Sequence, residues 1–149
     1  MTSLIFLDTN VPIYAAGAPH QLKAPCLTIL QLAARNEGFI TDAEVLQELF
    51  HRFWSRSRLR DEGMRTLHDF ALLMRGRVEP VYAEDVVLAP DLGDGANINA
   101  RDLLHAAVMQ RVGATRIVSA DRGFDGLQGI RRLDPADIEA WRAEVDTAP

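Results

Sequence analysis

Four acidic residues lie at positions where a protein with a parallel sheet could gather them into one site. Asp8 comes directly after an apolar run typical of a strand, and Asp121 follows another such run by two residues. Glu48 and Asp102 lie in segments with the apolar spacing of helices. Carboxylates that converge with no lysine or arginine among them repel one another unless a cation binds between them. Oxygen ligands in that number favour Mg²⁺ or Mn²⁺ over zinc.

Phosphodiester hydrolysis is the chemistry expected of such a cluster. A metal site of this kind activates a water molecule as the nucleophile and stabilises both oxygens of an in-line phosphoryl displacement, with one metal ion or two. We therefore expect Asp8, Glu48, Asp102 and Asp121 to be the catalytic and metal-binding residues, with Mg²⁺ or Mn²⁺ as the cofactor.

Three of the four acids also have a purely structural explanation. Asp8 and Asp121 could cap the turns that follow them, and Asp102 could pair with Asn99 at the start of a helix. Glu48 differs because it lies in mid-helix on an apolar stripe, beyond any cap, where a glutamate needs a partner.

The choice of Glu48 depends on where its helix begins. The segment Thr41-Asp42-Ala43-Glu44 has the threonine and glutamate spacing of a capping box, which predicts a helix from residue 41 or 42 to about residue 55. Because Glu44 is then engaged at the cap, Glu48, one turn later, is preferred as the metal ligand.

Strands and helices alternate along the chain. Apolar runs predict strands at residues 4–7, 39–41, 78–81, 116–119 and 130–133. Helices are expected around Pro12, at residues 24–35, 41–55, 60–74 and 100–112, and from Asp134-Pro135 onward. This alternation predicts a three-layer α/β/α domain with a mainly parallel, roughly five-stranded sheet. Strand ends and helix starts share one edge of such a sheet, so the four acids can meet there.

Length and composition fit one folded domain over residues 1–149, with 48% hydrophobic and 25% charged residues. Cys26 is the only cysteine, so an intrachain disulfide and a cysteine zinc cluster are excluded. The first apolar run breaks at Asp8, too early for a signal peptide or a membrane span, and we expect a cytoplasmic protein with no membrane partner. A net charge of −5 argues against nucleic-acid binding, but much of that charge would belong to the metal cluster.

Four segments resemble the blocks of PIN domains, in the same order. They are Leu-Asp-Thr-Asn at 7–10, Ile-Thr-Asp-Ala-Glu-Val-Leu-Gln-Glu-Leu at 40–49, Arg-Asp-Leu-Leu-His-Ala-Ala at 101–107 and Ile-Val-Ser-Ala-Asp-Arg-Gly-Phe-Asp at 117–125. The small size is similar to that of VapC toxins of type II toxin–antitoxin systems. The resemblance implies a Mg²⁺- or Mn²⁺-dependent endoribonuclease that acts on RNA, is commonly a homodimer, and is inhibited by a small antitoxin protein.

The resemblance also points to residues around the four acids. Thr9, Asn10 and Ser119 match small polar positions that support metal ligands or waters. Asp125 is a candidate fifth acid, or else a surface residue in a short turn. His105 lies three residues after Asp102 on nearly the same helix face, which suggests a ligand or a general base, although a packed, hydrogen-bonded histidine is more common.

Residues 51–60 form the most basic stretch of the chain, with aromatic residues between the arginines. Arg52, Arg56, Arg58 and Arg60 could contact RNA or the antitoxin, with aromatic side chains stacking on bases. The alternative is a solvated helix face whose aromatic residues lie in the core or in a dimer interface.

Other classes fit less well. A phosphoreceiver signalling domain also places aspartates at strand ends, but it needs a lysine at the site, and the one lysine, Lys23, is expected in a loop before a helix. A haloacid-dehalogenase-like phosphatase lacks the same lysine and the second acid of its Asp-x-Asp motif. A PIN-like module that binds RNA or protein without cutting remains an alternative, although all four acids are present.

Overall fold

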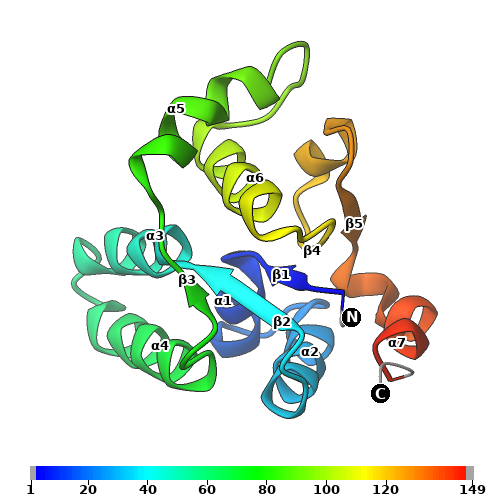
Figure 1. The fold of residues 1–149 in the computed structure, drawn as a ribbon. Coiled ribbons are helices and arrows are strands. Elements are labelled where there is room, and N and C mark those ends of the chain that lie inside the picture. The colour runs from blue at the N-terminus through cyan, green and yellow to red at the C-terminus, as the bar shows by residue number, and fades with distance from the viewer. Residues whose placement is uncertain (1–2, 147–149) are drawn as a thin grey trace.

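Five parallel strands form the central sheet of the computed structural model, which describes residues 3–146 (Figure 1). In spatial order the strands are β3 (Val78–Glu79), β2 (Phe39–Asp42), β1 (Ile5–Leu7), β4 (Arg116–Val118) and β5 (Arg131–Leu133). All four pairings are parallel. The expected fold class is therefore confirmed.

Strand β1 occupies the centre of the sheet. Ile5 is paired with Phe39 of β2 on one side and with Arg116 of β4 on the other. All three residues of β1 are buried, as a continuous apolar run in a parallel sheet predicts. The end of β1 thus lies between the ends of β2 and β4, at the edge where the acids were expected to meet.

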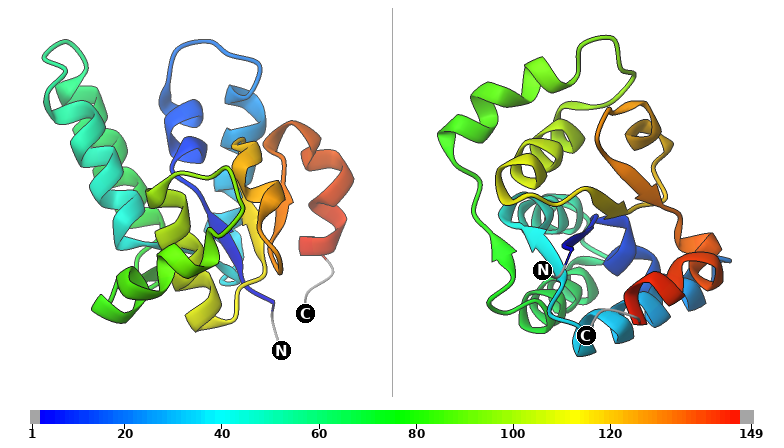
Figure 2. Two further views of the ribbon diagram at one scale, coloured as in Figure 1. Left: turned by 90° about the horizontal axis from the view of Figure 1, so that it is seen from above. Right: turned by 45° about the vertical axis from the view of Figure 1, so that its right-hand side comes forward.

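Helices cover both faces of the sheet. They are α1 (Asn10–Ala16), α2 (Lys23–Arg35), α3 (Ala43–Trp54), α4 (Arg60–Leu73), α5 (Ala83–Leu92), α6 (Ala100–Val112) and α7 (Ile138–Asp146), with short 3₁₀ turns at Arg122–Gly126 and Pro135–Asp137. Figure 1 shows α5 and α6 on one side of β1 and β4, and α1 and α2 on the other. Helices α3 and α4 form an antiparallel hairpin whose loop lies at one end of the molecule (Figure 2). None of the helices within residues 3–146 is long and apolar enough to cross a membrane.

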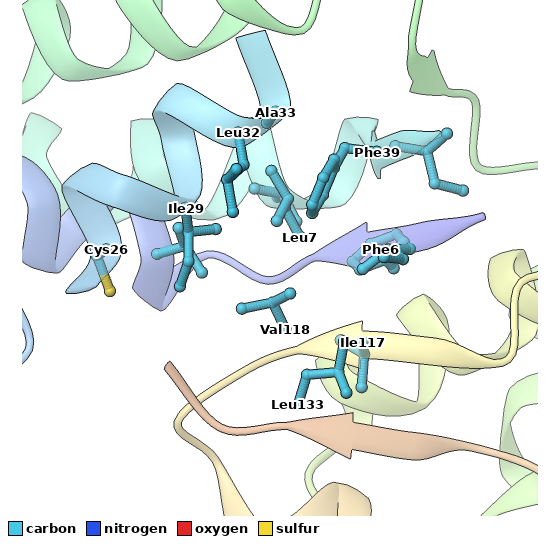
Figure 3. Packing of buried hydrophobic residues seen from close by; sticks show 14 of the residues in the cluster. Phe6, Leu7, Cys26, Ile29, Leu32, Ala33, Phe39, Ile117, Val118 and Leu133 are labelled. Carbon is cyan, nitrogen blue, oxygen red and sulfur yellow. The ribbon is translucent and has the colours of Figure 1, made fainter. Parts of the chain in front are cut away.

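One part of the hydrophobic core lies between the sheet and α2. Ile29 and Leu32 point from α2 toward Leu7 of β1, and Val118 and Leu133 continue the apolar layer across the sheet (Figure 3). Cys26 on the same face of α2 is also fully buried, so it acts as a small apolar residue.

Helix α5 has no counterpart in the sequence analysis. Its most apolar residues, Val86 and Val87, are exposed, and its buried positions are Asp85 and Ala89. The Arg111 guanidinium of α6 anchors the helix by an ion pair with Asp85 at 3.1 Å. The packed side of the helix carries Leu88, Ala89 and Leu92 beside Asp85, but the exposed valines obscure this apolar spacing in the sequence.

The predicted capping box at the start of α3 is wrong. Asp42 is the cap, because its Oδ1 accepts a hydrogen bond from the Val45 N–H at 2.9 Å. Thr41 still belongs to β2, and its hydroxyl donates to the Leu7 carbonyl at 3.0 Å. Strand β2 runs one residue further than expected because Thr41 and Asp42 pair with β3.

Candidate metal centre

Asp8 is held in a fixed orientation at the end of β1. Its Oδ1 accepts a hydrogen bond from the Thr9 N–H at 2.8 Å. Its Oδ2 accepts from the Ser119 hydroxyl at 2.6 Å and from the Asn10 side-chain amide at 3.2 Å. The carboxylate is buried, with 4% of the residue exposed. The hydrogen bonds and the burial prevent this carboxylate from turning toward solvent, so a cation can bind it only at this fixed position.

Ser119 and Asn10 tie the end of β4 to the end of β1. The Ser119 hydroxyl oxygen accepts from the Asn10 amide and from the Asp121 N–H, both at 3.0 Å. The side-chain oxygen of Asn10, Oδ1, accepts from the Ala120 N–H at 3.2 Å. These bonds place the two small polar residues where they support Asp8 rather than face solvent.

Asp102 lies in the first turn of α6, next to the cap. The Asn99 side chain accepts from the Asp102 N–H at 2.9 Å and donates to Asp102 Oδ2 at 2.7 Å. The reciprocal pair with Asn99 is therefore present, and it leaves Asp102 buried beside Asp8. Asp8, Asp102 and His105 each offer one ligand atom, and these three atoms lie within 4.8 Å of one another.

His105 is fully buried one turn after Asp102. Its Nδ1 lies 2.8 Å from Oδ2 of Asp42, the residue that also caps α3. Its Nε2 lies 3.7 Å from Asp8 Oδ1. The histidine is thus packed and hydrogen-bonded, as the more common case predicts, but its other nitrogen faces the acids.

Glu48 joins the rim of the cluster rather than its centre. Its Oε2 accepts from the Thr9 hydroxyl at 2.7 Å, and its Oε1 lies 3.4 Å from the Arg101 guanidinium. Arg101 also lies 3.8 Å from Glu44. The expectation that no arginine lies among the acids is therefore wrong. Glu44, which the capping-box interpretation removed from the site, faces the same rim.

Asp121 contacts the cluster from the exposed side. Its Oδ1 accepts from the Gly123 N–H at 2.8 Å, so it caps the turn that follows β4. Its carboxyl group also interacts with that of Asp102 and raises the pKa of Asp102. Asp125 behaves differently, because it is exposed and forms a two-pronged ion pair with Arg132. The surface interpretation of Asp125 fits this geometry.

The carboxyl groups of Asp8 and Asp102 both have raised pKa values. Burial raises the pKa of Asp8. Burial, the negative charge of Asp8 and the interaction with the Asp121 carboxyl group raise the pKa of Asp102 to about 8. Burial alone would lower the pKa of His105, but the hydrogen bond to Asp42 and the surrounding negative charges raise it to about 9. A site that must take up protons to balance its charge is one in which a divalent cation can replace them.

The four arginines of the basic stretch lie at the far end of the α3–α4 hairpin. Arg60 stacks 4.7 Å from the Trp54 ring and donates to the Trp54 carbonyl at 2.6 Å, and Arg52 lies 6.0 Å from the Phe53 ring. Arg56 and Arg58 are exposed. Trp54 is half exposed, so this aromatic residue does not belong to the core.

Comparison with known proteins identifies the family of the chain. The sequence profile of the PIN domain matches residues 5–130, and the chain therefore belongs to the PIN-domain family. Over 132 residues it is 39% identical to ribonuclease VapC13 of Mycobacterium tuberculosis, covering 87% of this chain and 99% of that protein. Over 122 residues it is 38% identical to ribonuclease VapC23 of the same species, covering 79% and 93%.

A solved structure supports the fold. The crystal structure of VapBC2 from Rickettsia felis, bound to a DNA fragment from its promoter, matches with a TM-score of 0.67 and 22% identity. The match covers 88% of this chain and 98% of that chain. At this identity the likeness concerns the fold of the chain.

Proposed function

We propose that the protein is a metal-dependent endoribonuclease of the VapC type, the toxin of a toxin–antitoxin pair. The observation that carries this proposal is the pair of buried carboxyl groups, Asp8 and Asp102, whose ligand atoms lie with that of His105 within 4.8 Å. The names of the relatives, ribonucleases VapC13 and VapC23, support RNA as the substrate.

The donor set fits a divalent ion. Asp8 and Asp102 supply buried oxygens, and Glu48 and Asp121 supply oxygens at the rim that an ion can draw in. A bound Mg²⁺ or Mn²⁺ supplies a water molecule of lowered pKa and positive charge near the phosphate oxygens. Thr9, Asn10 and Ser119 orient the carboxylates by the hydrogen bonds described above.

A small antitoxin protein is the expected partner, in keeping with the VapBC2 assembly of Rickettsia felis. The exposed arginines of the α3–α4 hairpin are candidates to contact either that partner or RNA. A homodimer is part of the same proposal.

RNA cleavage with and without metal tests the proposed activity. Purified protein should cut total bacterial RNA at discrete sites with Mg²⁺ or Mn²⁺, and excess EDTA should abolish the cutting. Asp8→Asn should lower the rate by about a hundredfold or more, because it removes a charged ligand. Asp94→Asn, an exposed acid in the loop before α6, is the matched control and should retain activity. Cutting that persists in EDTA or in Asp8→Asn would show that the site works without metal.

A further inference from the structure

His105 carries an unusual buried atom. Among the buried side-chain nitrogen and oxygen atoms of residues 3–146, His105 Nε2 is the one that has no hydrogen-bond partner. The residue is fully buried, and a buried polar group without a partner costs about 1–3 kcal/mol. Such an atom in a folded protein calls for an explanation, such as an ion that the site binds.

Asp42 decides which ring nitrogen of His105 is free to bind that ion. Asp42 Oδ1 accepts from the Val45 N–H, and Asp42 Oδ2 lies 2.8 Å from His105 Nδ1. A carboxylate only accepts hydrogen bonds, so Nδ1 carries the hydrogen. A metal ion that displaces the second ring proton then meets the lone pair of Nε2, which lies 3.7 Å from Asp8 Oδ1.

The atoms that face this lone pair are carboxylate oxygens. His105 and Asp102 lie one turn apart on α6 and therefore share a face of the helix. Together with Asp8 they bring one nitrogen and two oxygen ligand atoms within 4.8 Å of one another. A histidine that donates one ring N–H to a carboxylate and offers the other nitrogen to a metal is a recurrent arrangement in metalloproteins.

We propose that His105 Nε2 is a direct metal ligand, oriented by Asp42, and that the site consequently selects a divalent first-row transition ion over Mg²⁺. The inference rests on the proposed metal-dependent function and narrows it. Imidazole nitrogen is a favourable ligand for transition ions, whereas Mg²⁺ takes oxygen ligands and water. Asp42 is a positioning residue here, because it acts through the imidazole ring.

Mn²⁺ is the probe that tests the nitrogen ligand directly. Electron spin echo spectra of Mn²⁺ bound to the wild-type protein should show modulation from a coordinated ¹⁴N nucleus. Labelling histidine with ¹⁵N should replace that modulation, and His105→Gln should remove it. His68→Gln, an exposed histidine of α4, is the matched control and should keep it. The wild-type spectrum needs no variant, so it stays decisive if His105→Gln fails to fold.

Metal affinities measured by calorimetry give a second readout. The wild type should bind Mn²⁺ more tightly than Mg²⁺, and His105→Gln should lower that preference by roughly tenfold or more. Asp42→Asn retains a good cap residue for α3 but removes the carboxylate behind the ring, so it should lower Mn²⁺ affinity by about tenfold and alter the ¹⁴N coupling.

Two outcomes overturn the inference and separate it from the proposed function. Mn²⁺ that binds tightly with no ¹⁴N coupling would leave the ribonuclease site intact and make His105 a protonated partner of Asp8 and Asp42. No binding of either Mn²⁺ or Mg²⁺ would remove the metal centre altogether, and the proposed function with it.

Discussion

The acid cluster at the sheet edge and the arginines of the α3–α4 hairpin are both charged, but the protein holds them in opposite ways. Both oxygens of Asp8 accept hydrogen bonds, and the residue is buried. The side chains of Arg56 and Arg58 are exposed, and within the described part of the chain they form no hydrogen bond or ion pair. The cluster therefore has fixed geometry, whereas these arginines contribute charge without fixed geometry.

This difference predicts different roles for the two regions: the cluster binds a metal ion for catalysis, and the arginines attract a charged partner. Fixed, desolvated carboxylates bind a cation in a defined position, but they cost the fold stability when that cation is absent. Exposed arginines change the stability of the fold little. They attract a negatively charged partner, and salt shortens the range of that attraction by screening the charges. Removing metal should therefore affect the cluster, and raising salt should affect the hairpin.

The largest expected effect is a loss of stability with rising pH in metal-free protein. Asp102 has a folded-state pKa of about 8, and His105 one of about 9, both above their ordinary values of 3.8 and 6.5. Groups with raised pKa values stabilise the fold at low pH and lose that contribution as pH rises. The Asp102 contribution falls between about pH 4 and pH 8, and that of His105 between about pH 6.5 and pH 9.

Urea unfolding in EDTA measures this effect. Between pH 6.5 and pH 8 the free energy of unfolding should fall by about 1.4 kcal/mol per pH unit for each proton lost on unfolding. Saturating Mn²⁺ replaces those protons, so the free energy of unfolding should then stay constant or rise with pH. A metal-free stability that stays constant or rises over this range would mean that the cluster carries no excess protons.

A smaller effect is expected from Glu48→Gln at the rim. Glutamine can still accept from the Thr9 hydroxyl, and the change removes both the attraction to Arg101 and the repulsion from Asp8. These terms oppose each other, so in EDTA the variant should match the wild type within about 0.5 kcal/mol.

Added metal should then separate the two proteins. At ten times the dissociation constant, a metal ion stabilises the wild type by about 1.4 kcal/mol, and Glu48→Gln should gain clearly less at the same concentration. Thermal melts over a Mn²⁺ series measure this difference. Glu62→Gln, an exposed glutamate of α4, is the control and should gain as much as the wild type. Equal gains in Glu48→Gln would exclude Glu48 as a ligand.

Local rules placed Asp8, Asp102 and Asp121 at the edge of the sheet because these residues follow strand ends or begin a helix. Parallel strands bring such positions to one edge, so Asp8 and Asp121 could be placed without knowing any long-range contact. The pair of Asp42 and His105 could not be predicted in this way. The two residues are 63 positions apart, and their contact depends on how α6 packs over the end of β2.

The directions of side chains account for the other differences between the sequence-based expectations and the structure. Arg101 precedes Asp102 by one residue, and only the packing of α6 against α3 turns it toward Glu44 and Glu48. Helix α5 was missed because its valines face solvent, which apolar periodicity does not anticipate. Sequence patterns thus predicted which residues reach the edge, while packing decided which of them meet.

The smallest effect on the fold, and the clearest on salt dependence, is expected from reversing two charges of the hairpin. Arg56→Glu with Arg58→Glu alters exposed side chains, so stability should change by less than about 0.5 kcal/mol. Arg60 is left in place because it stacks on Trp54 and donates to its carbonyl. Arg75→Glu, an exposed arginine just after α4, is the matched control.

If the hairpin contacts RNA, each arginine that neutralises a phosphate releases counterions on binding. The slope of log affinity against log salt for single-stranded RNA should then flatten by about 0.7 per contact, hence by about 1.4 for the pair, when binding is measured in EDTA so that no RNA is cut. The control should keep the wild-type slope. An unchanged slope in the double variant, with weaker binding to the antitoxin, would assign these arginines to the protein partner. Unchanged binding to both would show that they are a solvated surface.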